Sequence, residues 1–286
     1  MVREMVEEDK PLAYVLGTQP FHPLPIDLLV RPPTLIPRPE TEHWVLHLSQ
    51  VILESLPSTS SAPKPFRILD IGTGTGCIAL GLAHSLLHPS APSPPTSPFS
   101  SVYALAVDKS TSAISLASEN ATRCNLEQQV TFLETDVFAD DFPSVARRGL
   151  GGGGGGRGGE QGFDLVVSNP PYITLDEYAR LDASVREWED RGALVGERPG
   201  AAPAAVDDGL VFYRRIAGLL GELLVDSSPL LDGASAAPVV AFEVGEGQAR
   251  AVAALLEERG FKAEIVSDPW GVERAVFGWR NPNGRS

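Results

Sequence analysis

From residue 66 onward, short apolar runs alternate with stretches of helical periodicity. The apolar runs are nearly continuous, as is typical of strands that are covered on both faces. They are FRILDIG (66–72), VYALAVD (102–108), VTFLETD (130–136), FDLVVSN (163–169), VVAFEVG (239–245), AEIVSD (263–268) and RAVFGWR (274–280). Helical patterns start near Cys77, Ser110, Asp208 and Gln248, and we expect Asp208 to be an N-cap. The alternation predicts an α/β fold with a mostly parallel sheet.

The composition excludes several classes of protein. With 286 residues, of which 43% are hydrophobic, the chain can bury a substantial core. No apolar run approaches the roughly 20 residues that span a bilayer, so we expect no membrane partner. The formal net charge of -14 repels polyanions, so we expect no direct contact with nucleic acid. Cys77 and Cys124 form no CxxC pair and are expected to be ordinary packing residues.

Four connections have the composition of flexible insertions. They lie at about residues 88–101, 147–162, 197–208 and 226–238 and are rich in proline, serine, glycine or alanine. Insertions of this kind cost little loop-closure free energy at a protein surface. The glycine-rich insertion contains few arginines, so a linker is favoured over an RNA-binding segment.

A glycine-rich turn follows the first of these strands, in the sequence LDIGTGTGCIAL. Gly72, Gly74 and Gly76 allow a tight turn, let backbone amides approach a ligand and lead into a helix N-terminus. We expect the whole turn, Thr73 and Thr75 included, to bind a cofactor. Because nucleotide-dependent dehydrogenases use a similar turn, the motif leaves the choice open between a dinucleotide and S-adenosylmethionine.

Two further strands end in acidic residues at the same edge of the predicted sheet. Asp108 ends the second strand, where its carboxylate can accept hydrogen bonds from a ribose diol. Asp136 and Val137 end the third strand and are suited to the edge and face of an adenine. One such aspartate alone could equally cap a helix or lie in a solvated turn. Three successive strand ends, one glycine-rich and two acidic, favour a cofactor that contains a nucleoside.

The fourth strand ends abruptly in Asn169, Pro170, Pro171 and Tyr172. Two consecutive prolines remove two backbone donors and fix two φ angles, so the stretch is either a rigid terminator or a site. The Asn169 side-chain oxygen and the Pro170 carbonyl can each accept one N–H of a substrate NH₂ group. Tyr172 can pack against the amide, for a cation–π type contribution of about 0.5 to 2 kcal/mol. We expect these four residues to be catalytic, with Asn169 also beside the cofactor.

At these residues the chain resembles the class I S-adenosylmethionine-dependent methyltransferases, and more closely the PrmC/HemK family of protein-(glutamine-N5) methyltransferases. The resemblance also rests on PLAYVLG (11–17), LIPRPETE (35–42), DGLVFYRRI (208–216), FEVGEGQ (242–248) and GVERAVFG (271–278). It implies a Rossmann-like fold with a seven-stranded, mostly parallel sheet, helices on both faces and a last antiparallel strand. It further implies that S-adenosyl-L-methionine is the cofactor and S-adenosyl-L-homocysteine the product.

The resemblance also implies a reaction and a partner. The methyl group would pass to the side-chain amide nitrogen of the glutamine in the GGQ loop of a peptide chain release factor. The motif LIPRPETE, which is specific to the family, implies a substrate loop in which Arg38, Pro39 and Glu40 lie near the ligand. The alternative is that this segment has only a structural role, as a kinked connection before the next helix. His43 and His47 lack a third ligand, so we expect no metal site.

By this resemblance, residues 1–42 form an N-terminal remnant with a hairpin or linker, and residues 43–286 form the methyltransferase domain. Two departures from the family stand out. Only ten residues precede Pro11, where family members have a small helical domain that helps to dock the release factor, so we expect a truncated product or weakened docking. Glu189 and Asp190 stand where the family has Glu-Pro, and we expect this to have little mechanistic consequence.

Two other functions are compatible with the sequence. Amino-methyltransferases that act on adenine in nucleic acid use a related Asn/Asp-Pro-Pro-Tyr loop, although the charge of -14 and the lack of a basic extension argue against them. A catalytically silent binding scaffold is a second alternative. We expect a monomer and a mitochondrial release factor as target, with a cytoplasmic location as the alternative.

Overall fold

A computed structural model describes residues 2–55, 65–89, 99–150, 162–197, 208–225 and 237–281 of the chain. The central parts of the four expected insertions, residues 90–98, 151–161, 198–207 and 226–236, lie outside these ranges. None of the helices within the ranges is both long enough and apolar enough to cross a membrane.

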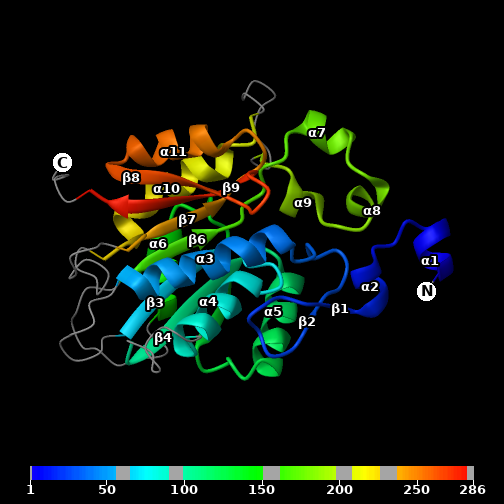
Figure 1. The fold of residues 1–286 in the computed structure, drawn as a ribbon, viewed down its shortest axis with the longest axis horizontal. Coiled ribbons are helices and arrows are strands. Elements are labelled where there is room, and N and C mark those ends of the chain that lie inside the picture. Colours follow the sequence, from blue (N-terminus) through cyan, green and yellow to red (C-terminus); the bar gives the residue numbers. More distant parts are fainter. Residues whose placement is uncertain are drawn as a thin grey trace.

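A seven-stranded sheet forms the centre of the molecule (Figure 1). Its strands are β3 (Pro65–Ile71), β4 (Ser101–Asp108), β5 (Val130–Glu134), β6 (Leu165–Ser168), β7 (Val240–Glu243), β8 (Phe261–Ser267) and β9 (Glu273–Arg280). They lie in the order β5-β4-β3-β6-β7-β9-β8. Pairing is parallel from β5 through to β7, and β9 runs antiparallel to both β7 and β8. The expected mostly parallel sheet with a last antiparallel strand is confirmed.

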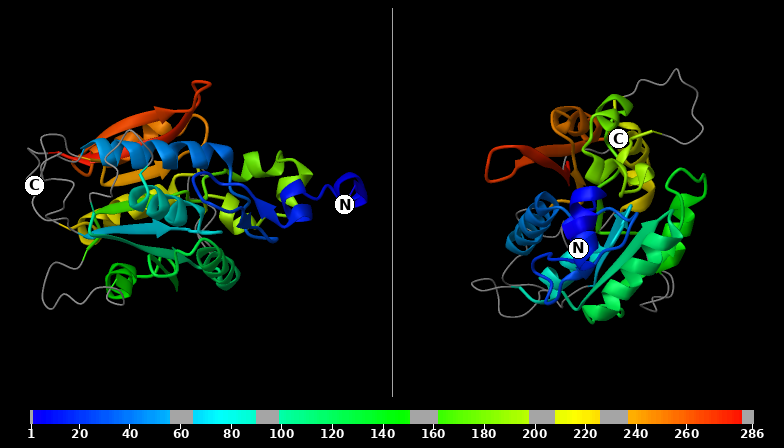
Figure 2. Two further views of the ribbon diagram at one scale, coloured as in Figure 1. Left: turned by 60° about the horizontal axis from the view of Figure 1, so that its bottom comes forward. Right: turned by 90° about the vertical axis from the view of Figure 1, so that its right-hand side faces the viewer.

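Helices cover both faces of this sheet, as Figures 1 and 2 show. One face carries α3 (Pro39–Ser55), α4 (Cys77–Leu87) and α5 (Thr111–Arg123), and the other carries α6 (Phe142–Gly149), α10 (Val211–Leu223) and α11 (Ala249–Glu257). This arrangement explains the apolar strands, because every residue of β6 and β7 is buried. Cys77 and Cys124 are also buried and unpaired, and burial raises the pKa of the Cys77 thiol to about 12.

The start of α10 differs from the sequence-based expectation. The helix begins at Val211, and its N-cap is Leu210 rather than Asp208. Gly209 has a left-handed φ of 68°, which ends any helical path from Asp208. The Asp208 carboxylate instead accepts a hydrogen bond from Leu210 N at 3.0 Å and forms an ion pair with Arg214.

The N-terminal segment lies at the carboxyl edge of the sheet, beside the connection that follows β6 (Figure 1). It contains α1 (Val2–Glu7), α2 (Leu12–Leu16) and an antiparallel hairpin of β1 (Thr18–Gln19) and β2 (Leu28–Leu29). Tyr14 Oη donates to Thr34 O at 2.7 Å, and Trp188 Nε1 donates to Glu8 O at 2.9 Å. These bonds fix the residues that lead into α3.

Candidate active site

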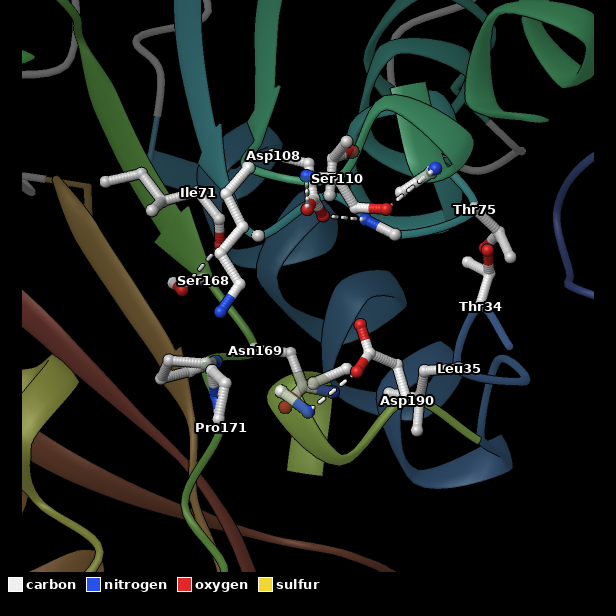
Figure 3. Close-up of a pocket in the computed structure, with 18 of the residues that line it drawn as sticks. Thr34, Leu35, Ile71, Thr75, Asp108, Ser110, Ser168, Asn169, Pro171 and Asp190 are labelled. Atoms are coloured by element: carbon white, nitrogen blue, oxygen red, sulfur yellow. Dashed lines mark hydrogen bonds between the residues drawn. The ribbon is translucent and has the colours of Figure 1, made fainter. Parts of the chain in front are cut away.

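A cavity of about 1070 Å³, counting its solvent-filled mouth, opens at the carboxyl edge of the parallel strands (Figure 3). Such an edge is where open α/β sheets bind ligands. Most of the expected cofactor residues line it, namely Gly72, Thr73, Gly74, Thr75, Asp108, Asp136, Val137 and Asn169. The structure therefore brings together residues from the ends of four strands.

The glycine-rich turn is held against the neighbouring strand by its own backbone. Gly72 N and Thr73 N donate to Val107 O at 2.8 and 3.0 Å, and Gly74 N donates to Asp108 Oδ2 at 3.0 Å. Gly72 has a φ of 77°, which favours glycine, and a side chain there would approach Asn169 O. The turn thus joins the ends of β3, β4 and β6 in one rigid wall.

Gly76 has a different role from the other glycines of the motif. It lies at the N-cap of α4 with a φ of 85° and does not line the cavity. A Cβ at this position would lie 3.2 Å from Leu80 Cδ1 and 3.3 Å from Ala117 Cβ. Gly76 is therefore needed for the close packing of α4 against α5 rather than for contact with a ligand.

Asp108 faces the cavity from the end of β4. Its oxygens accept hydrogen bonds from Gly74 N and from Ser110 N, the latter at 2.9 Å. Burial raises the pKa of Asp108 above its ordinary value, these two amides and Lys109 oppose the rise, and nearby Asp190 adds to it. Each carboxylate oxygen keeps lone pairs for a ligand, which suits a diol donor.

Asp70 lies directly beneath the turn and was not anticipated from the sequence. It is fully buried, and Thr73 Oγ1 donates to its Oδ2 at 2.7 Å. Burial raises the pKa of Asp70 to about 7, although the Thr73 hydroxyl acts in the opposite direction. An acid within the otherwise apolar run ILDI was the available signal.

The loop after β5 is fastened to α10 on the opposite side of the sheet edge. Asp136 Oδ1 accepts from Phe138 N at 2.8 Å, and Arg215 Nε donates to Val137 O at 2.8 Å. Phe212 packs edge-on against Phe138, with 5.0 Å between ring centroids, and also lines the cavity. With Val137 and Phe212 in its lining, this end of the cavity is partly apolar, which suits an adenine ring.

A second cavity of about 520 Å³ adjoins the first. Leu35, Arg38, Asn169 and Ala193 line both, whereas Pro170 and Pro171 line only the first and Tyr172 only the second. The NPPY stretch therefore separates two spaces. Ser168 Oγ donates to Ile71 O at 2.7 Å and anchors the start of this stretch to β3.

Two glycines and one glutamine clamp Tyr172. A side chain at Gly209 would overlap Tyr172 O, and a Cβ at Gly245 would lie 2.8 Å from the Tyr172 ring. Gln248 Nε2 donates to Tyr172 O at 3.0 Å. Burial, with a contribution from Glu243, raises the pKa of the Tyr172 hydroxyl. The motifs DGLVFYRRI and FEVGEGQ thus serve to hold the tyrosine in place.

The LIPRPETE segment places only one of its three expected residues at a cavity. Arg38 lines both cavities, and its guanidinium pairs at 2.5 Å with Glu189, whose side chain is fully buried. Pro39 and Glu40 line neither cavity, because α3 begins at Pro39 and Glu40 faces Arg274 at 3.5 Å. Proline is favoured at a first helical position, where its missing N–H is not needed.

The same segment is tied to β7 by a buried acid. Thr41 Oγ1 and Trp44 Nε1 donate to Glu243 Oε2 at 2.6 and 2.8 Å. Within the described ranges, no group of three or more histidine, cysteine or acidic side chains is suited to a metal ion. His47 stacks on Phe277 instead, with 5.9 Å between ring centroids.

Three short helices between Tyr172 and Gly196 supply further cavity residues that sequence reasoning missed. They are α7 (Leu175–Ala179), α8 (Ala183–Arg186) and α9 (Arg191–Leu194). Asp190 and Ala193 line the large cavity from this segment, and Thr34 and Leu35 line it from the N-terminal side (Figure 3). Neither set belongs to a strand end, so the sheet pattern gave no signal for them.

The strand order β5-β4-β3-β6-β7-β9-β8, with a cavity at the carboxyl edge of its parallel strands, is that of a class I methyltransferase fold. A methyltransferase structure from Agrobacterium tumefaciens, described as S-adenosylmethionine-dependent, has the same fold, with a TM-score of 0.50 and 17% identity over 93% of this chain and 71% of that one. No protein-family model matches the sequence.

Two curated relatives define the family. The release factor glutamine methyltransferase of Geobacter sulfurreducens is 35% identical over 270 residues, which cover 94% of this chain and 73% of the relative. The enzyme of the same name from Flavobacterium psychrophilum is 32% identical over 272 residues, covering 95% of this chain and 76% of the relative. The chain belongs to the family of release factor glutamine methyltransferases.

Proposed function

We propose that this enzyme transfers a methyl group from S-adenosyl-L-methionine to the side-chain amide nitrogen of the glutamine in the GGQ loop of a peptide chain release factor. The observation that carries the proposal is the position of Asn169, which lines both the large cavity and the smaller one beside it. An acceptor amide in the smaller cavity can therefore meet a methyl donor in the larger one. The names of the relatives supply the class of acceptor.

The large cavity fits the cofactor in three places. Gly72 and Gly74 leave the backbone of the turn open to a ligand, Asp108 offers acceptors for a ribose diol, and Val137 and Phe212 form an apolar lining for adenine. When bound, S-adenosyl-L-methionine supplies an electrophilic methyl group on a positively charged sulfur. Asp108, Asp136 and Asp190 line the cavity together with Arg38 and Lys109, so the acidic side chains outnumber the basic ones around such a cation.

The protein's own residues act mainly by positioning. An amide nitrogen is a poor nucleophile, because its lone pair is delocalised into the carbonyl. The Asn169 side-chain oxygen and the Pro170 carbonyl each accept one N–H of the glutamine, so the nitrogen is aimed at the large cavity. The two prolines fix these acceptors before substrate arrives, which reduces the entropy lost on binding.

Tyr172 completes the acceptor site from the smaller cavity. Its backbone is held by Gln248 and Gly209, so its ring has a fixed position against the acceptor amide. The ring face stabilises positive charge that develops on the nitrogen during transfer. No base is needed before transfer, since the amide proton can leave once the nitrogen carries the methyl group.

A methyl-transfer assay tests this proposal. Purified protein is incubated with labelled S-adenosyl-L-methionine and either a release-factor fragment that carries the GGQ loop or DNA with unmodified adenine. Label on the glutamine, located by mass spectrometry, is the expected result. Label on the DNA alone would establish the nucleic-acid alternative, and cofactor binding without transfer to either substrate would favour a silent scaffold.

We also propose that the enzyme acts as a monomer on a mitochondrial release factor. The bacterial origin of the two relatives compared above supports the mitochondrial compartment. Mass spectrometry of the GGQ glutamine in mitochondrial and cytosolic release factors, from cells with and without the gene, would test it. Loss of methylation from the cytosolic factor alone would contradict the mitochondrial assignment.

A further inference from the structure

Asp190 lines the large cavity from the connection between α8 and α9 (Figure 3). We propose that Asp190 is a second cofactor-binding carboxylate, which accepts a hydrogen bond from a ribose hydroxyl on the side of the cavity opposite Asp108. This inference rests on the proposed function, because the ligand is taken to be S-adenosyl-L-methionine. It gives a role to a residue that, by the family resemblance, has only local consequences.

The carboxylate of Asp190 is held rigidly and points inward. Its Oδ1 caps α9 by accepting from Gly192 N at 2.8 Å, and its backbone N–H donates to Pro33 O at 2.7 Å. In Figure 3 the other oxygen points into the cavity, toward the side on which Asp108 and Ser110 lie. Across the described ranges no hydrogen-bond donor reaches this Oδ2, so it is available to a ligand.

The charges around Asp190 favour a ligand that brings hydroxyl donors. Asp190 and Asp108 lie near enough for Asp190 to contribute to the raised pKa of Asp108, after the larger effect of burial. Two carboxylates that face the same space repel each other unless donors come between them. Lys109 relieves part of this repulsion, because its ammonium lies near Asp190. Both side chains approach Gly192: a Cβ there would lie 3.2 Å from Lys109 Nζ and 3.3 Å from Asp190 Oδ1. A vicinal diol supplies one donor to each acid.

Contact with Asp190 also links the two cavities. Asp190 is the N-cap of α9, and Ala193 of that helix lines both the cofactor cavity and the acceptor cavity. Pro33, which accepts the Asp190 N–H, precedes Leu35, another residue that lines both. A cofactor bound to Asp190 therefore fixes two walls of the acceptor cavity before the release factor arrives.

The test compares two variants with two ligands by calorimetry. Asp190→Asn keeps an oxygen for the α9 cap but removes the charge, and Asp182→Asn makes the same change at an exposed position of the same segment. The ligands are S-adenosyl-L-homocysteine and its 2′,3′-dideoxy analogue. We expect Asp190→Asn to bind S-adenosyl-L-homocysteine about tenfold more weakly than the wild type, as for the loss of a hydrogen bond to a charged group. The dideoxy analogue should bind to the wild type and to Asp190→Asn with affinities that agree within about twofold. Asp182→Asn should match the wild type in its affinity for each of the two ligands.

Three outcomes would overturn the inference or its basis, and they are distinguishable. Equal affinity of wild type and Asp190→Asn for S-adenosyl-L-homocysteine would overturn the role of Asp190 alone. An equal loss for the dideoxy analogue would show that the variant disturbs the cavity rather than a hydroxyl contact. Failure of the wild type to bind S-adenosyl-L-homocysteine at all would instead refute the proposed function. Thermal melting checks that Asp190→Asn is folded, and Asp190→Ser, which also can cap α9, is the substitute if it is not.

Discussion

Gly209 lies so close to Tyr172 that a side chain at position 209 would overlap the tyrosine's carbonyl oxygen. The two residues come from segments on either side of the three short helices, so this contact joins the two ends of that segment beside the acceptor cavity. Gly209 also has a left-handed φ of 68°, which only glycine adopts without strain. The tyrosine of the NPPY stretch is therefore positioned by a glycine 37 residues further along the chain.

Replacement of this glycine should damage both stability and activity. We expect Gly209→Ala to lower the free energy of unfolding by about 1 to 3 kcal/mol and to reduce kcat through displacement of Tyr172. Gly221→Ala is the matched control, because no atom lies within 4 Å of its added Cβ. It lies in α10 and should be neutral or stabilising by up to about 1 kcal/mol. Urea denaturation and steady-state kinetics measure both effects, and equal stability of the two variants would contradict the clamp.

Asn169 should affect the chemical step more than cofactor binding. We expect Asn169→Ala to lose about 2 to 4 kcal/mol of transition-state stabilisation, as when one oriented polar contact is removed. Its affinity for S-adenosyl-L-methionine should fall much less. Asn169→Asp keeps a side-chain acceptor and should retain more activity than the alanine variant. Single-turnover rates separate the two effects, and an unchanged rate for Asn169→Ala would remove this residue from the mechanism.

The sequence predicts the sheet well because strand burial leaves a strong signal. All seven expected runs are strands in the structure, with ends that shift by at most a few residues, and every residue of β6 and β7 is buried. The last strand's direction came from the family resemblance rather than from its residues. The start of α10 was placed too early because an aspartate before an apolar run resembles an N-cap, whereas the left-handed Gly209 delays the helix.

Strand-end residues of the site could be predicted, but those from irregular segments could not. Asp108 and Asn169 follow apolar runs, so their position at one edge is a consequence of parallel pairing. Asp190 and Leu35 reach the same cavity through turns whose path depends on long-range contacts, such as the bond from Asp190 N to Pro33 O. Glu40, a motif residue expected near the ligand, lines neither cavity and faces Arg274 instead.

Asp70 should give the stability of the enzyme a distinct pH dependence. Burial raises its pKa to about 7, so the folded state binds a proton that the unfolded state releases at lower pH. The contribution of Asp70 is therefore fully present below the unfolded pKa of about 4 and is lost as pH rises through about 7. We expect Asp70→Asn to flatten the decline in unfolding free energy between these values. Urea denaturation at a series of pH values measures it, and Asp176→Asn, an exposed change, should leave the slope as in the wild type.

The pair of Arg38 and Glu189 should be far more sensitive to single changes than a surface pair. Arg38 is the counter-ion of the fully buried Glu189 carboxylate, which also accepts a backbone hydrogen bond from Ile36, so Arg38→Met leaves a buried charge without its counter-ion. We expect a loss of about 3 to 5 kcal/mol in unfolding free energy, and recovery of most of it in the double variant Arg38→Met, Glu189→Gln. The exposed pair of Arg180 and Asp176 is the control, where Arg180→Met should change stability by less than about 1 kcal/mol.

Because burial raises the pKa of Glu189 and Arg38 lowers it, the stability lost in Arg38→Met should also shrink at acidic pH, where Glu189 is neutral. A loss in Arg38→Met that is independent of pH would show that packing of the arginine, rather than its charge, supports the acceptor cavity.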